Sequence, residues 1–128
     1  MPNAILSSLK DESPKKDNQK ILNFQNGGYV IHVGLNAFSN EHLVGDHPHR
    51  DCFWLHAMAA RGSHVVLCVH NRPEPPDVVI QYAAGIALRF SKSEAKTVSI
   101  ALLKDLFKPE DVSIGVWMTK KSASVEVL

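Results

Sequence analysis

The sequence predicts one domain of the α+β class, built on an antiparallel or mixed sheet with one main helix and one short helix. Short runs of β-branched and aromatic residues alternate with turn-forming residues, which is typical of strands. One segment, 77–90, repeats its apolar residues at helical spacing. The elements follow the order strands, short helix, two strands, long helix and further strands. This order lacks the regular strand–helix alternation of parallel α/β folds.

Composition and charge narrow the class of protein. A chain of 128 residues with 45% hydrophobic and 21% charged residues is typical of a soluble globular domain that buries its own core. The sequence contains no apolar window long enough to cross a membrane and no signal-peptide core, so we expect a cytoplasmic protein. Its net charge of +1 does not by itself indicate a polyanionic partner. A nucleic-acid site would have to be a local patch.

The first part of the chain divides into a tail and a hairpin. Residues 1–20 are polar and charged, and we expect a flexible tail ahead of a domain spanning 21–128. Strands at 21–24 and 29–33 flank the turn residues 26–28. A short helix is predicted over 39–44, with Ser39 as its N-cap.

The central stretch predicts two adjacent antiparallel strands, 51–56 and 63–70, joined by a linker that ends in Arg61-Gly62. Side chains alternate between the faces of a strand. One face is purely apolar and should form the core: Phe53, Leu55, Val65, Leu67 and Val69. The opposite face is mixed and is where function is expected: Cys52, Trp54, His56, His64, Val66, Cys68 and His70. We interpret the two cysteines as reduced packing residues.

The segment 77–90 is the clearest predicted helix. Its apolar stripe should pack on the sheet, and its small residues, Gly85 among them, should allow a close approach. Further strands are predicted at 98–103, 113–119 and 124–127.

The residues do not indicate catalysis. Ser63 and His64 are neighbours on one strand and face opposite sides, and the sequence has neither a nucleophile elbow nor a phosphate-binding loop. His47 and His49 are not accompanied by a zinc-binding spacing, so a solvated loop is the favoured interpretation. We therefore expect no enzyme activity, no cofactor and no metal.

A binding face is a better candidate. His56 and His64 flank the linker that carries Arg61, and Arg89, Lys92 and Lys96 would share one side of a helix that continued past residue 90. Clusters of Arg and Lys bind phosphates, while His and Trp can stack on bases. The alternative is structural: hydrogen-bonded histidines, a core tryptophan and a solvated helix end.

A specific motif favours the binding interpretation. The pattern Asp-x-x-Trp-x-His, five residues, then Gly-Ser-His-Val-Val is met by Asp51, Trp54, His56 and 62–66. Further matches lie on both sides of it: Gly34, Asn36, Asn40, Leu43, Ala83, Ala84, Ala87, 90–92, 108–109 and Gly115. From Gly28 to Leu128 the chain thus resembles the NFACT-R domain, an RNA-binding module of ribosome-associated quality control factors that also occurs as small stand-alone proteins. The chain departs from this pattern at Leu35, Met58 and Glu94, where the family has basic residues, whereas Arg61 adds a charge.

The resemblance implies a non-catalytic, stand-alone module that binds ribosomal RNA or tRNA in translation quality control. The expected phosphate contacts are Arg61, His64 and Lys92, with His56 and Trp54 as orienting or stacking groups. Arg89, Asn36 and Asn40 complete the predicted site. The alternative is a protein-interaction module that has lost RNA binding and docks through the mixed sheet face. An enzyme is a third possibility, which a metal at His47 and His49 would indicate.

Overall fold

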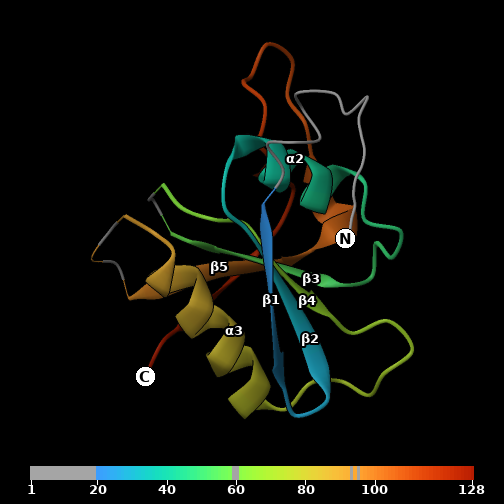
Figure 1. Ribbon diagram of the computed structural model, residues 1–128, viewed down its shortest axis with the longest axis vertical. Helices are drawn as coiled ribbons and strands as arrows, with labels where there is room; N and C mark the ends of the chain where they lie inside the picture. Colours follow the sequence, from blue (N-terminus) through green and yellow to red (C-terminus); the bar gives the residue numbers. More distant parts are fainter. Residues whose placement is uncertain (1–19, 59–60, 93, 95) are drawn as a thin grey trace, which may run out of the picture.

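Six strands form one sheet with a helix on each face (Figure 1). The structure, a computed structural model, describes residues 20–58, 61–92, 94 and 96–128. The strand order is β1-β2-β4-β3-β5-β8, and every neighbouring pair is antiparallel. The elements are β1 (Ile21–Asn26), β2 (Tyr29–Gly34), α2 (Ala37–Gly45), β3 (Phe53–Ala57), β4 (Val65–Cys68), α3 (Asp77–Arg89), β5 (Thr97–Leu102), the 3-10 turn η1 (Leu103–Asp105), β6 (Leu106–Phe107), β7 (Met118–Thr119) and β8 (Ala123–Glu126). The predicted α+β class is confirmed.

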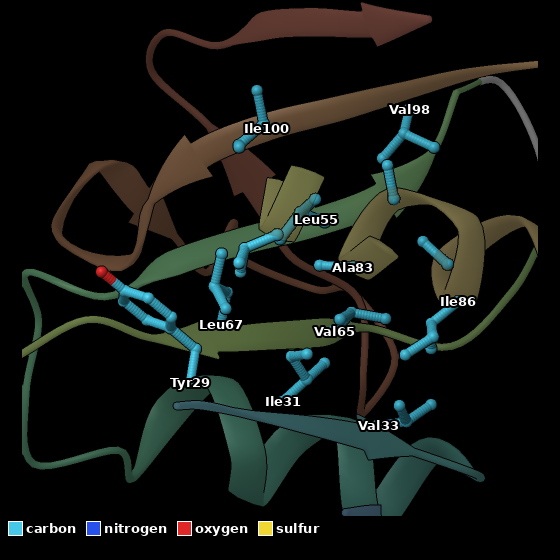
Figure 2. Close-up of a cluster of buried hydrophobic side chains, with 13 residues drawn as sticks. Tyr29, Ile31, Val33, Leu55, Val65, Leu67, Ala83, Ile86, Val98 and Ile100 are labelled. Carbon is cyan, nitrogen blue, oxygen red and sulfur yellow. The ribbon is translucent and has the colours of Figure 1, made fainter. Parts of the chain in front are cut away.

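The central hairpin has the predicted faces. Leu55 lies opposite Val65 and Phe53 lies opposite Leu67, so their side chains share one face of the sheet. Helix α3 packs on this face with Ala83, Ala84, Ile86 and Ala87, which interleave with side chains of β2, β4, β3 and β5 (Figure 2). Gly85 is the exception among the small residues of α3, because a Cβ at this position would meet no atom within 4 Å. The expected close approach at Gly85 is therefore wrong.

The mixed face is a second core rather than an open surface. Trp54, Val66 and Ala101 of the sheet are buried there, together with residues that come from α2 and from the segment after β5: Leu43, Val44, Leu103 and Leu106. Arg50 fixes this layer, since its guanidinium donates hydrogen bonds to the carbonyls of Val44 and Leu103. The middle of the mixed face is therefore covered, while His56 and Cys68 near its two ends stay partly exposed.

Helix α2 begins earlier than predicted. Its N-cap is Asn36, whose side-chain oxygen accepts a 2.8 Å hydrogen bond from the Ser39 amide. Ser39 lies inside the first turn and is fully buried, so its assignment as N-cap is wrong.

Two elements in the second half of the chain also differ from their predictions. Helix α3 ends at Arg89, so Lys92 and Lys96 do not continue its charged side. The strand predicted over 113–119 is reduced to β7, because Gly115 has a positive φ of 85° and interrupts it.

The predicted tail, 1–20, lies outside the described residues except for Lys20. Among the described residues, neither helix has the length and apolar character needed to cross a membrane.

Candidate functional site

A cleft of about 540 Å³ opens where four segments meet. These are the start of α2, the end of β3 with the linker that follows it, the residues after α3, and the loop 114–117. Six of the predicted site residues line the cleft: Asn36, Asn40, His56, Arg61, His64 and Lys92. Segments far apart in the sequence thus bring most of the predicted residues to one place.

A short backbone ladder holds the two cations of this cleft side by side. The Lys92 amide donates to the Arg61 carbonyl at 2.9 Å, and the Ser63 amide donates to the Phe90 carbonyl at 3.2 Å. Gly62 permits this contact, because a Cβ there would lie 2.9 Å from both Cα and Cβ of Ser91. Arg61 is exposed and Lys92 lies at the surface beside it. The ladder therefore presents two adjacent positive charges at the rim.

The floor of the cleft rests on a buried Trp–His pair. The Trp54 indole Nε1 donates to His64 Nδ1 at 2.8 Å, and each residue is only 6% exposed. Burial, with the nearby His56 in second place, lowers the pKa of His64 to about 3. At neutral pH His64 is thus an uncharged imidazole that accepts from Trp54. Its backbone amide donates to Asn40 Oδ1 at 3.2 Å, which ties β4 to α2.

His56 spans the linker between β3 and β4. Its Nδ1 lies 2.8 Å from the Ala57 carbonyl and its Nε2 lies 3.3 Å from the Gly62 carbonyl. A neutral ring can donate to one of these oxygens and a protonated ring to both. The ring is parallel to that of Trp54 within 8°, with centroids 5.8 Å apart. His56 therefore orients both the linker and the floor.

The sequence analysis missed the fourth wall, residues 114–117. Glu41 on α2 anchors it, since its Oε1 accepts from the Gly115 amide at 2.6 Å and from Lys108 Nζ at 2.5 Å. Trp117 lines the cleft, and its buried indole Nε1 has no hydrogen-bond partner among the described residues. Gly115 was matched in the motif, but predicting a strand over 113–119 concealed the loop that it forms.

Two predicted residues lie outside the cleft. Trp54 is beneath it, so burial favours the orienting role over base stacking. Arg89 borders a different hollow, next to Phe24 and Tyr82. The group of potential metal ligands found among the described residues, His32, His47 and Cys68, is also elsewhere.

Comparisons with known proteins find similarity to RqcH proteins. No protein-family model matches the chain. Rqc2 homolog RqcH of Bacillus subtilis is 36% identical over 91 residues, which are 69% of this chain and 15% of that protein. Rqc2 homolog RqcH of Streptococcus pneumoniae is 35% identical over 86 residues, 65% of this chain and 15% of that protein. This chain is similar to a short segment of RqcH. It spans about 15% of the length of these curated relatives.

A solved structure has a similar fold. The C-terminal part of the fibronectin/fibrinogen-binding protein from Streptococcus suis matches with a TM-score of 0.73 and 28% identity. The match covers 92% of this chain and 46% of that one. The six-stranded sheet and its two helices are thus an architecture that a related protein also has.

Proposed function

We propose that this chain is a non-catalytic RNA-binding module of the NFACT-R type that acts in ribosome-associated quality control in the cytoplasm, on ribosomal RNA or tRNA. The similarity to RqcH and the motif from Asp51 to Val66 support the setting. One structural observation carries the binding role. The cations Arg61 and Lys92 are fixed side by side on a cleft whose other walls contain amide and aromatic side chains.

The cleft offers the two kinds of contact that RNA recognition uses. Arg61 and Lys92 neutralise backbone phosphates, and the aromatic and apolar side chains of Trp117 and Phe90 offer surface to unstacked bases. The buried Trp54 and His64 support the floor and carry no charge at neutral pH. The cation pair therefore supplies the electrostatic part of the affinity.

Charge reversal at the rim tests this proposal. Fluorescence anisotropy with a labelled tRNA and with ribosomal RNA fragments would be measured at two salt concentrations. Arg61→Glu combined with Lys92→Glu should lower the affinity at low salt at least tenfold. The slope of log K against log salt should also flatten by roughly 0.7 to 0.9 for each phosphate that the variant no longer neutralises. Leu35→Arg should have the opposite effect, because Leu35 lines the same cleft where the family pattern has a basic residue.

The matched control is Lys120→Glu combined with Lys121→Glu. Both lysines are exposed, and neither lines the cleft. This control changes the net charge as much as the rim variant does. Equal affinity and equal salt slope for the rim variant and the control would refute the assignment.

A second function is favoured by the apolar part of the cleft. Leu35, Ile114 and Val116 are 39%, 38% and 43% exposed, and large exposed apolar side chains that gather at one site are typical of protein interfaces. In this alternative a ribosomal protein contacts the loop 114–117. Val116→Asp should then abolish binding to ribosomal subunits, while Arg61→Glu combined with Lys92→Glu leaves it unchanged. The reverse result supports RNA.

A further inference from the structure

Three side chains with metal-ligating atoms converge on the α2 side of the sheet, away from the cleft. His32 lies on β2, Cys68 ends β4, and His47 belongs to the loop between α2 and β3. His32 is paired with Val66, so Cys68, two residues further along β4, is its diagonal neighbour on the same face. The potential ligand atoms of the three residues all lie within 4.8 Å of one another. The sheet register brings His32 and Cys68 together, and the loop between α2 and β3 adds His47.

The separation of two of these atoms is close to that in a zinc site. His47 Nε2 lies 3.8 Å from Cys68 Sγ. A nitrogen at about 2.0 Å and a sulfur at about 2.3 Å from a tetrahedral zinc ion are about 3.5 Å apart. The third ligand atom, on His32, lies within 4.8 Å of the other two, and rotation of partly exposed side chains can bring it closer. The group is therefore nearly arranged for coordination.

Neighbouring groups orient the two rings. His32 Nδ1 lies 2.5 Å from Asn23 Oδ1, and this oxygen can only accept, so the neutral ring has its lone pair on Nε2. A hydrogen-bonded second nitrogen is usual for a metal-ligating histidine. The His49 amide donates to His47 Nδ1 at 3.1 Å. Coordination through Nε2 would place the proton on Nδ1 and break this bond, so residues 47–49 must adjust when a metal binds.

Metal binding would fix the protonation states of the three side chains, because a ligating imidazole is neutral and a ligating thiol is deprotonated. Burial and the adjacent Cys52 raise the pKa of the Cys68 thiol to about 11. A bound metal displaces that proton, which passes to solvent. Asp46 and His49 border the same hollow and can supply the fourth ligand.

We propose that His32, His47 and Cys68 bind one first-row transition-metal ion, Zn²⁺ foremost, which fastens the α2–β3 loop to the sheet. Two imidazoles and one thiolate prefer such an ion to Mg²⁺ or Ca²⁺, which take oxygen ligands. The site shares no residue with the cleft. Its role is structural and independent of the proposed RNA binding.

Cobalt substitution tests the site directly. The full chain, without a histidine tag and free of metal, would be titrated with Co²⁺ and followed by absorption. One equivalent should produce a sulfur-to-cobalt charge-transfer band in the near ultraviolet, which Zn²⁺ abolishes by displacing Co²⁺. Cys68→Ser should lose this band, and His32→Ala and His47→Ala should each weaken binding at least tenfold. The control His42→Ala should keep both band and affinity, because His42 borders the hollow without belonging to the group.

A second measurement does not depend on folding of the cysteine variant. In the wild-type chain Zn²⁺ should slow alkylation of Cys68 at least tenfold, whereas Cys52 is fully buried. Absence of the charge-transfer band in the wild-type chain, or equal alkylation with and without Zn²⁺, would overturn the proposal. The variant Arg61→Glu combined with Lys92→Glu should bind Co²⁺ normally, which separates this site from the RNA proposal.

Discussion

His64 shows how one buried residue can make the stability of this chain depend on pH. In the folded state the ring is neutral, with a pKa of about 3, and Nδ1 accepts from the Trp54 indole. In the unfolded chain the pKa returns to about 6.5. Between these values the unfolded state binds more protons than the folded state. Stability therefore falls as the pH drops below about 6.5, with a limiting slope of about 1.4 kcal/mol per pH unit.

The variant His64→Asn should remove this dependence. Asn keeps an acceptor for the Trp54 indole but does not titrate, so it should be less stable than wild type at pH 7 by about 1–3 kcal/mol. The difference should shrink as the pH falls to 4. Urea unfolding at pH 7, 6, 5 and 4 measures it, with the exposed His42→Asn as control. A constant difference between wild type and His64→Asn across this range would contradict the assigned titration.

Strand alternation predicts the side of the sheet for each residue, but not what covers that side. It placed Trp54, His64 and Cys68 on one face, as the structure does. The three histidines suggested a functional face. The cover comes from α2 and from residues 103–106, whose contacts are long-range and leave no periodic pattern in the strands. The approach of His47 to Cys68 depends on the same long-range folding.

Glycines at two elements have opposite structural roles. Gly62 contacts the end of α3 so closely that a Cβ would lie 2.9 Å from the Ser91 backbone, whereas Gly85 within α3 has open space around it. Gly62→Ala should destabilise the chain by about 1–3 kcal/mol through overpacking and weaken RNA binding severalfold by separating Arg61 from Lys92. Gly85→Ala should stabilise it by about 0.5–1 kcal/mol through helix propensity and leave RNA binding unchanged.

Thermal unfolding and anisotropy measure both glycine variants. They change the same atoms in different surroundings, so each serves as the control for the other. Stabilisation by Gly62→Ala, or weaker RNA binding by Gly85→Ala, would show that the contact between linker and helix does not position the cations.

Helix and strand boundaries were predictable where local signals agree. Periodicity predicted a helix over 77–90, and α3 spans Asp77–Arg89. Helix α2 was misplaced because Asn36 and Ser39 are both good N-caps three residues apart, and sequence does not distinguish them. The strand predicted over 113–119 failed because Glu41, distant in sequence, holds Gly115 in a loop. The missed wall of the cleft follows from that single contact.

At the scale of the whole molecule, the sheet carries an apolar cluster on each face. Helix α3 covers one cluster, and α2 with η1 covers the other. The element order predicted the α+β class, because it excludes regular βαβ units. It could not predict the second cluster, whose members come from short segments without helical or strand periodicity. The cleft lies where α2 meets the ends of the strands, so its shape depends on this second layer.

Leu103→Ala tests whether that second layer unfolds together with the sheet. Leu103 is fully buried in the cluster beneath α2, and truncation of such a side chain costs about 2–5 kcal/mol. Both tryptophans, Trp54 and Trp117, pack in this layer, so their fluorescence reports on it, whereas far-ultraviolet circular dichroism reports on the whole chain. The His64 amide donates a hydrogen bond to Asn40 of α2, and the Leu103 amide donates one to the Cys52 carbonyl next to β3. Because these bonds connect the layer to the sheet, the two urea transitions should coincide in wild type and variant. If the fluorescence changes at a lower urea concentration than the circular dichroism, the second layer unfolds independently of the sheet. The matched variant Leu67→Ala, in the cluster beneath α3, should shift both transitions equally.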